Sequence, residues 1–460
     1  MTTTIKKYVF LCVMLLLWAV PAWSTTNYTV SNIDELRAAI TSADSGAIIT
    51  LNASTYDLTS TLSITKSITL KGNTSSGTII QRSSSASSKF SNITISGASA
   101  DMVILQNLTI ANASTDDNGG GINYKANGTL SIDNCIITNN MSSNYSGGIY
   151  NSSGTANITN STIIGNSATN FGGGIYNYTG TANITNSNIT GNSANSSGGG
   201  IYNSSGTANI TNSTITGNTT QYGGGIYVNG GTANIINCTI SGNSASINGG
   251  GIYGSGGTAN ITNSTITGNT ANQGGREIHN NRATLSALNT LIWNSSNATA
   301  GNLTLTNCAT FNGSGTNLVI LSSWANPVSS SVEVDGVTHT VFIPESNDAL
   351  LVLVGKGVKT SSTPATDQLG KARAKRPTIG AIEGVSVSVI TVSCDVDTVQ
   401  VTEGYSADIA VSADLADDYK ACTISWDISP DVSGITFSDG VLRVGVNVPV
   451  GSYNVELLQA

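Results

Sequence analysis

The chain has 460 residues, of which 10% are charged, and its formal net charge at pH 7 is −8. This acidic balance argues against a nucleic-acid partner, because binding phosphates requires a basic stripe of lysine and arginine. The length exceeds one ordinary domain, and the composition divides it. Asn, Gly, Ser, Thr and Ile dominate up to about residue 325, and acidic residues with alternating valines mark the last segment.

Residues 1–24 are predicted to be a secretory signal peptide. Lys6 and Lys7 precede an apolar run from Tyr8 to Val20, and Ala22-Trp23-Ser24 offers a small-x-small cleavage site. The run is shorter than the ~20 residues that span a bilayer, which disfavours a membrane anchor. We therefore expect an extracellular or cell-surface protein with no integral membrane span. Removal of the signal leaves 16 basic and 26 acidic residues, a net charge of −10.

A short helix over about residues 31–43 is expected to cap the N-terminal end of the fold. Ser31-Asn32-Ile33-Asp34 is similar to a capping box. Leu36, Ala39 and Ile40 follow at helical spacing. A helix in this position would cover the open edges and the apolar interior of a first strand coil.

Residues 25–325 are predicted to form a right-handed parallel β-helix, which makes the fold all-β. No charged side chain occurs from Asn134 to Gly275, and a phrase close to GGGIYNSSGTANITNSTITGN recurs every 25 to 27 residues. Its Ile-Tyr pairs are Ile149-Tyr150, Ile175-Tyr176, Ile201-Tyr202, Ile226-Tyr227 and Ile252-Tyr253. A fixed period of this length indicates a solenoid. A β-propeller needs ~40 residues per blade, and a leucine-rich horseshoe needs a Leu pattern that is absent.

Side-chain alternation divides one repeat into three short strands and three turns. In Ala156-Asn157-Ile158-Thr159 a period of two places Ala156 and Ile158 inside and the other two residues outside. Bends are predicted at Asn160, at Gly165-Asn166 and after glycines 172–174, because Asn and Gly tolerate the left-handed conformation. Stacking then predicts two internal asparagine ladders whose amides satisfy one another from coil to coil. One ladder contains Asn160, Asn186, Asn212, Asn237 and Asn263, and the other Asn166, Asn192, Asn218, Asn243 and Asn269.

The cysteines of the coils are predicted to be unpaired. Cys135, Cys238 and Cys308 each follow an asparagine where other coils have Asn-Ser, so we expect small inward-facing residues. Cys135 and Cys238 would lie four coils apart, about 19 Å at ~4.8 Å per strand, which is beyond the reach of a disulfide. Cys394 and Cys422 could form a disulfide in an oxidising compartment, and the sequence leaves this open.

The phrase Gly-Gly-Gly-Ile-Tyr-Asn with Ile-Thr-Asn-Ser-Thr-Ile-Thr-Gly-Asn resembles the coils of bacterial pectin-lyase-like β-helix proteins, including polymorphic outer-membrane protein repeats. Residues 326–384 resemble the closing segment of the choice-of-anchor Q domain family. The resembling motifs are Gly336-Val337-Thr338-His339, Thr366-Asp367-Gln368-Leu369-Gly370, Arg373 and Ile379-Gly380-Ala381-Ile382-Glu383. The resemblance implies a secreted or surface-attached protein. Residues 385–460, with Trp426 and alternating strands, resemble a bacterial immunoglobulin-like β-sandwich.

Catalysis is not expected from the sequence. The resemblance implies that enzymes of this fold place carboxylates and a basic residue on their central coils, and the coils here have none. Asp116-Asp117 lies in a turn, and Arg276, Glu277 and His279 are interpreted as a charged rim on a degenerate coil. The sequence therefore predicts a protein that is not an enzyme and that holds no metal or cofactor. A polysaccharide lyase or glycoside hydrolase that uses residues outside the neutral coils is the alternative.

The candidate binding surface is a row of outward-pointing tyrosines, aligned by stacking at ~4.8 Å intervals. The row contains Tyr150, Tyr176, Tyr202, Tyr227 and Tyr253. Exposed aromatic rings among Asn and Thr suit sugar rings, and a ladder that only stacks on itself is the alternative. Rows of Thr also suggest ice binding, but Ile236 and Asn188 interrupt them. The predicted function is that of a monomeric, non-catalytic, adhesin-like or stalk-like protein that contacts polysaccharide or host or matrix glycans.

Overall fold

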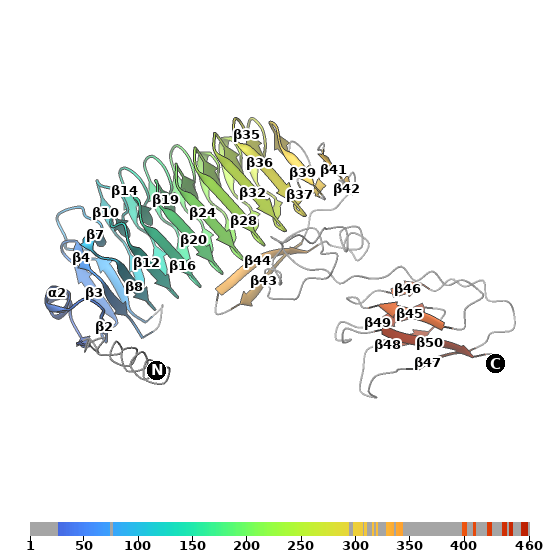
Figure 1. Cartoon of the computed structure of the whole chain (residues 1–460), viewed down its shortest axis with the longest axis horizontal. Helices are drawn as coiled ribbons and strands as arrows, with labels where there is room; N and C mark the ends of the chain where they lie inside the picture. Colours follow the sequence, from blue (N-terminus) through green and yellow to red (C-terminus); the bar gives the residue numbers. More distant parts are fainter. Residues whose placement is uncertain are drawn as a thin grey trace, which may run out of the picture.

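The main body of the structure is a parallel β-solenoid (Figure 1). The computed structural model describes residues 26–73, 77–293, 298–306 and 308, and beyond these only strand segments between residues 309 and 458. Short strands of successive coils pair in parallel into four sheets of 13, 12, 10 and 7 strands. The prediction of an all-β parallel β-helix is therefore confirmed.

Each sheet collects one strand from successive coils. Sheet A runs from β1 (Tyr28–Val30) to β41 (Gly315–Thr316), and sheet B from β3 (Thr55–Leu58) to β42 (Val319–Ile320). Sheet C runs from β4 (Leu62–Lys66) to β38 (Thr299–Ala300), and sheet D from β10 (Ser114–Thr115) to β34 (Thr270–Ala271). The sequence predicted three strands per coil, and the short strands of sheet D are the fourth.

The inward and outward faces of the strands follow the predicted alternation. One central coil consists of β15 (Ile149–Asn151), β16 (Thr155–Thr159), β17 (Thr162–Ile164) and β18 (Ser167–Ala168). Each strand pairs in register with the next coil, so that Ala156 lies beside Ala182. Ala156 and Ile158 are at most 1% exposed, whereas Asn157 and Thr159 are half-buried on the outer face.

Two of the three bends lie where the sequence predicted them, since Asn160 has a φ of 49° and Gly165 has a φ of 65°. The third was predicted after glycines 172–174, but the left-handed residue is Gly172, with a φ of 66°, and strand β19 (Ile175–Asn177) follows the glycines directly. The equivalent asparagines Asn186, Asn212, Asn237 and Asn263 have φ values between 48° and 54°. Asn and Gly adopt this left-handed conformation at lower cost than other residues, which explains why the same two residue types recur at the corners.

One of the two predicted ladders is fully internal. Asn166 and Asn192 are 0% exposed, and the backbone and side-chain N–H groups of Asn166 both donate to Asn192 Oδ1 at 3.0 Å. The Asn160 ladder is internal only in part, because Asn160, Asn186 and Asn212 are half-buried whereas Asn237 and Asn263 are 0% exposed. A third, unpredicted ladder is internal as well, with Asn151 Nδ2 donating to Asn177 Oδ1 at 2.8 Å.

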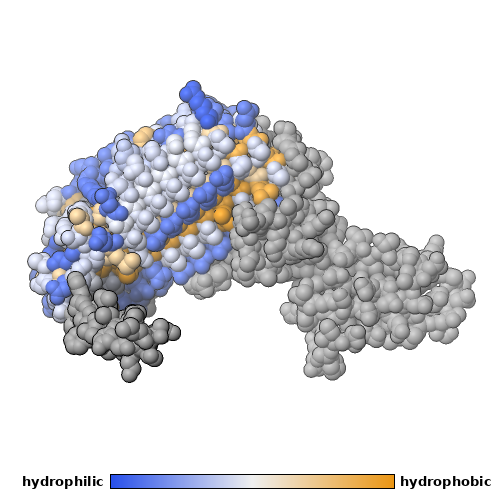
Figure 2. Space-filling view, in the orientation of Figure 1, coloured by the Kyte–Doolittle hydropathy of each residue, from blue (hydrophilic) through white to orange (hydrophobic). Residues whose placement is uncertain are grey.

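A further asparagine ladder lies on the outer face of sheet A. Asn183 Nδ2 donates to Asn157 Oδ1, and Asn209 Nδ2 donates to Asn183 Oδ1, both at 2.8 Å. Asn234 and Asn260 extend the ladder over the next two coils. Figure 2 shows hydrophilic bands that cross the coils on the side in view. The coils formed by residues 134–275 carry no charged side chain.

The predicted N-terminal cap is confirmed as α2 (Ile33–Ser42). Asn32 is its N-cap, and Asn32 Oδ1 accepts a hydrogen bond from the Glu35 backbone N–H at 2.9 Å. Glu35 in turn accepts from the Ser31 N–H at 2.7 Å and from Asn32 Nδ2 at 2.8 Å, an arrangement similar to a capping box but shifted by one residue. Leu36 and Ala39 are buried against the first coils.

The coil cysteines are buried and unpaired, as predicted. Ser161 stands where Cys135 stands one coil earlier, and the Cys135 backbone N–H donates to Ser161 Oγ at 3.1 Å. Burial raises the pKa of Cys135 and of Cys238 to about 12, so both thiols stay protonated.

Beyond the solenoid the described strands are antiparallel. They are a hairpin of β43 (Val328–Val334) and β44 (Val337–Ile343), a sheet of β45 (Thr398–Thr402), β50 (Ser452–Leu458) and β47 (Ala421–Ser425), and a sheet of β46 (Asp408–Ala410), β49 (Val441–Val444) and β48 (Ile435–Ser438). The predicted signal peptide and a Cys394–Cys422 disulfide lie outside the described residues. The 326–384 and 385–460 assignments lie largely outside them. In the described part of the chain, no helix has the length and hydrophobicity to cross a membrane.

Candidate functional site

The tyrosine row exists as a continuous stack of rings on sheet C. Each tyrosine is the middle residue of a three-residue strand. The strands are β15, β19 (Ile175–Asn177), β23 (Ile201–Asn203), β27 (Ile226–Val228) and β31 (Ile252–Gly254). Tyr202 lies 4.9 Å from Tyr176 and from Tyr227 between ring centroids, with interplanar angles of 7° and 6°. His279 in β35 (Ile278–Asn280) extends the stack beyond Tyr253, at 5.0 Å and 1°.

A second row of aromatic rings lies beside the first, on the segments that precede the sheet C strands, and one of its members, Tyr222, is the last residue of β26 (Thr219–Tyr222). Tyr145 stacks on Tyr176 at 4.9 Å, and Phe171 stacks on Tyr202 at 4.9 Å. Tyr222 meets Tyr253 edge-on at 5.4 Å. Each ring of this second row therefore contacts the tyrosine of the following coil.

The prediction that the tyrosine row is exposed is wrong. Tyr150 is 9% exposed, Tyr176 and Tyr202 are 6% exposed, and Tyr253 is 7% exposed, while Tyr227 is half-buried. The side chains do point out of sheet C, but their neighbours in the stack and the rings of the second row cover them. A sequence signal was available, since Tyr145, Phe171 and Tyr222 each precede a row tyrosine by five residues.

One aromatic side chain of this region is largely in solvent. Tyr178 is 45% exposed, and its ring centroid lies 6.4 Å from that of Tyr176. Burial raises the pKa of Tyr176 to about 12, and it also raises the pKa of Tyr202 above its usual range. These row hydroxyls therefore stay uncharged in neutral solution, and the surrounding coils add no charged side chain.

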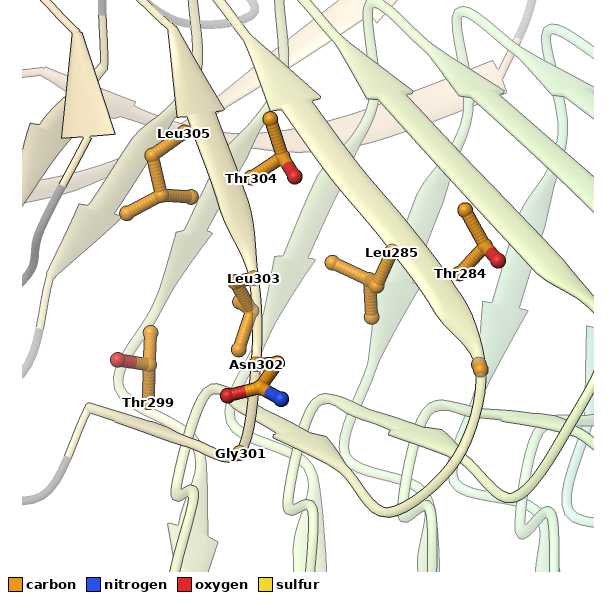
Figure 3. A pocket seen from close by; sticks show the side chains of 9 residues that line it. Thr284, Leu285, Thr299, Gly301, Asn302, Leu303, Thr304 and Leu305 are labelled. Carbon is orange, nitrogen blue, oxygen red and sulfur yellow. The ribbon is translucent and has the colours of Figure 1, made fainter.

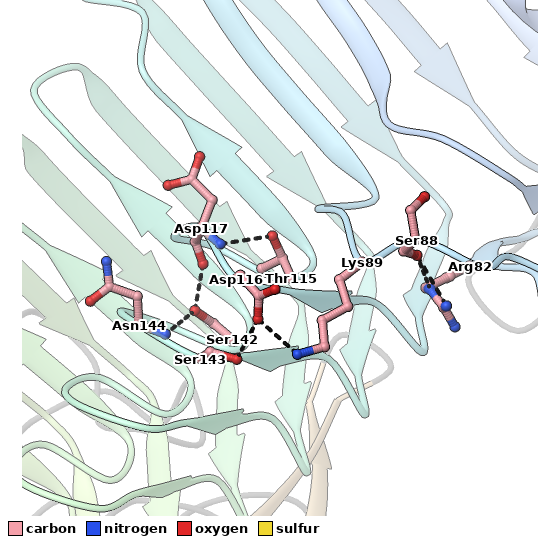
Figure 4. Close-up of polar contacts among 9 residues, drawn as sticks. All are labelled: Arg82, Ser88, Lys89, Thr115, Asp116, Asp117, Ser142, Ser143 and Asn144. Atoms are coloured by element: carbon pink, nitrogen blue, oxygen red, sulfur yellow. Dashed lines mark hydrogen bonds and ion pairs between the residues drawn. The ribbon is translucent and has the colours of Figure 1, made fainter.

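The paired acids near the N-terminal coils form exposed ion pairs. Lys89 Nζ lies 2.8 Å from Asp116 Oδ1 (Figure 4). Lys125 Nζ lies 3.1 Å from Asp117 Oδ2. Hydrogen bonds from Lys89 and from Ser143 lower the pKa of Asp116. Burial opposes ionisation of Asp117, but the Asn118 N–H and Lys125 outweigh it and lower its pKa. Both carboxylates therefore remain ionised and paired at neutral pH.

The sequence predicted that Glu277 belongs to a charged rim. This prediction is wrong, because Glu277 is 0% exposed. It occupies the position that Gly251 occupies one coil earlier, next to the paired Ile252 and Ile278. Its carboxylate accepts hydrogen bonds from the backbone N–H and the side-chain amide of Asn269. A glutamate in place of the last glycine therefore closes the internal asparagine ladder.

At the other end of the same ladder, an asparagine likewise stands in place of a glycine. Asn92 occupies the position of Gly121, since Ile93 pairs with Ile122. It is 0% exposed, and its Nδ2 donates to the Ala111 carbonyl at 2.6 Å, in the coil where Ala113 stands in place of a ladder asparagine. The sequence signal for both buried polar residues was the replacement of the repeat's glycine, by Asn92 before the first repeat and by Glu277 after the last.

A cavity of about 410 Å³ opens between the last coils (Figure 3). Strand β39 (Thr304–Thr306) pairs with β36 (Thr284–Leu288) from Ser286 onward, and Leu285 and Leu303 lie beside the remaining gap. Thr284, Thr299, Asn302 and Thr304 supply polar atoms around these leucines. None of the described residues that line this cavity is titratable. In the described part of the chain, no group of three or more His, Cys, Asp or Glu could hold a metal ion.

Comparison with known proteins returns three solved structures of low similarity. A pectate lyase, Pel9A, is 14% identical, with 78% of this chain and 97% of that chain covered and a TM-score of 0.48. An alginate lyase of family PL6, AlyGC, is 13% identical over 79% and 60% of the two chains, with a TM-score of 0.32. ORF18 of Geobacillus virus E2 is 14% identical over 65% and 58%, with a TM-score of 0.31. No protein family and no curated protein matches the sequence.

The prediction that the chain is not an enzyme is contradicted by these comparisons and is withdrawn. Two of the three similar structures are polysaccharide lyases. The prediction rested on the neutral central coils, which are residues 134–275 and not the whole chain. At these identities the likeness concerns the fold, and it assigns no reaction to this chain.

Proposed function

We propose that this chain is a secreted or cell-surface β-helix protein that binds neutral polysaccharide along its aromatic side, in an adhesin-like or stalk-like role. The observation that carries the proposal is the pair of aromatic rows, which lie side by side over successive coils without any charged side chain. Sugar rings present apolar C–H faces to aromatic rings and hydroxyl groups to polar rims.

The accessible parts of this surface are the half-buried second row, the half-buried Tyr227 and the exposed Tyr178. The half-buried rings of the second row are Tyr145, Phe171 and Tyr222. The stacked tyrosines beneath them act as a rigid support, because each ring is held between neighbours about 5 Å away. A rigid surface loses little conformational entropy when a ligand binds. The signal-peptide pattern and the resemblance to choice-of-anchor Q proteins support an extracellular location.

A retention assay on insoluble neutral polysaccharides tests the proposal. Tyr178→Ala should lower retention about 2- to 12-fold, the equivalent of ~0.5–1.5 kcal/mol for an aromatic stacking contact. Ile164→Ala is the matched control, because Ile164 is 37% exposed but lies on sheet B. Absence of retention on every polysaccharide contradicts the proposal. Shortening or desaturation of the polysaccharide in the same incubation would instead identify a polysaccharide lyase or glycoside hydrolase.

A further inference from the structure

The second aromatic row is interrupted at one coil. Its positions follow each other in isolated parallel pairings, from Phe171 to Ser197 and from Ser197 to Tyr222. Ser197 thus stands between two aromatic residues in the same row, one coil from each. It is the residue that precedes Tyr202 by five positions, as Phe171 precedes Tyr176.

The interruption leaves Tyr227 without a covering ring. Phe171 stacks on Tyr202 one coil further on, and by the same geometry the side chain at position 197 would stack on Tyr227. Within residues 77–293, the rings that contact Tyr227 are those of Tyr202 and Tyr253 in its own row. Tyr227 is the half-buried tyrosine of the row, whereas the other four are at most 9% exposed.

We propose that a neutral sugar ring takes the place of the missing aromatic side chain and stacks against Tyr227. This inference rests on the proposed function and narrows it to one subsite. Phe171 and Tyr222 stand two coils apart, about 10 Å at ~4.8 Å per coil. A flat sugar ring placed midway between Phe171 and Tyr222 would lie about 5 Å from each. This distance is similar to the 4.9 Å between the ring centroids of Phe171 and Tyr202.

The charge of the region selects the class of sugar. No Lys or Arg occurs from Asn134 to Gly275, so the carboxylate of a uronic acid would lose its hydration without gaining a counter-charge. A neutral hexose loses no charge–water contacts, and its hydroxyls can bond to water and to neighbouring hydroxyl groups. The subsite therefore favours a neutral hexopyranose unit over a uronate unit.

An array of immobilised neutral and uronic-acid oligosaccharides, probed with the full chain, tests the subsite. Ser197→Tyr fills the interruption with a ring and should lower binding to neutral oligosaccharides about tenfold or more, the equivalent of ~1.4 kcal/mol. Ser197 is itself 5% exposed, so Ser197→Ala adds no ring over Tyr227 and should bind as the unsubstituted protein does. Asn248→Tyr is the matched control, because it adds the same ring one coil beyond Tyr222.

The outcomes distinguish failure of the Tyr227 subsite from failure of the proposed polysaccharide-binding function. Binding that survives Ser197→Tyr but falls in Tyr178→Ala overturns the subsite and leaves the proposed function standing. Preferential binding of uronic-acid oligosaccharides also overturns the subsite. No binding of the unsubstituted protein to any sugar overturns both proposals. The thermal unfolding midpoint of Ser197→Tyr should equal or exceed that of the unsubstituted protein, which separates a filled subsite from a misfolded chain, and Ser197→Phe provides a second filling variant.

Discussion

The internal asparagine ladder should contribute much more to stability than the outer one, and a matched pair of substitutions can show this. Asn192 is 0% exposed, whereas Asn183 lies in the same coil on the outer face and is half-buried. Both side chains bond to asparagines of the neighbouring coils. Replacing each by Ala removes the same atoms from the chain, so only the environment differs.

The cost of Asn192→Ala follows from its hydrogen bonds. Asn192 Oδ1 accepts from the backbone N–H and from Nδ2 of Asn166, both at 3.0 Å. Its Nδ2 also donates to the Ile163 carbonyl at 2.9 Å. The substitution leaves two donors of Asn166 buried without this acceptor, at ~1–3 kcal/mol each, so the free energy of unfolding should fall by about 2–6 kcal/mol. Asn183→Ala should cost no more than ~0.5 kcal/mol, because water can replace the lost amide at the surface.

Urea unfolding followed by circular dichroism at 218 nm, near the strand minimum (about 215–220 nm), measures both effects. The midpoint of Asn192→Ala should lie well below that of the unsubstituted protein, and the midpoint of Asn183→Ala should lie close to it. Equal midpoints for the two variants would refute the argument that burial, and not the number of ladder bonds, determines the contribution.

Three further predictions follow from the burial of other residues. Ile210 is 0% exposed, so Ile210→Asp should cost several kcal/mol in urea unfolding, whereas Thr211→Asp on the outer face should be mild. Burial lowers the pKa of His279, so the folded state binds its proton less readily than the unfolded state and stability should fall as the pH drops below ~6.5. His279→Tyr should reduce this loss between pH 8 and pH 5, and an unchanged pH profile contradicts the assignment. Tyr202→Ala should lower the free energy of unfolding by about 3–5 kcal/mol, because it removes a buried ring, and a neutral effect in calorimetry would show that the stack is dispensable.

The sequence predicted those features that depend on local periodicity. Alternation placed Ala156 and Ile158 inside, and recurring Asn and Gly marked the corners, because each repeat imposes the same backbone conformation on the next. The capping helix and the unpaired cysteines followed from equally local signals. These predictions needed only the spacing of residues within one coil and the stacking of identical coils.

The environment of the site depended on contacts between different segments, and the sequence reading missed it. The tyrosines point outward as predicted, but the turn that carries Phe171 folds over the neighbouring coil and covers Tyr202. Glu277 was assigned to the surface because charged residues usually lie there. The structure buries it, since the missing glycine lets its side chain reach the last asparagine of the ladder.

The burial of the tyrosine row determines how the binding proposal can be tested. Tyr176 and Tyr202 each contact several rings, so replacing them removes packing and any binding surface together, and a loss of retention could not be assigned to either cause. Tyr178 is 45% exposed, and its replacement leaves the stack of the row intact. Ser197→Tyr should also weaken binding, and it removes no packing because it adds a ring to the second row. A loss of retention without a loss of stability in these two variants can therefore be attributed to the surface itself.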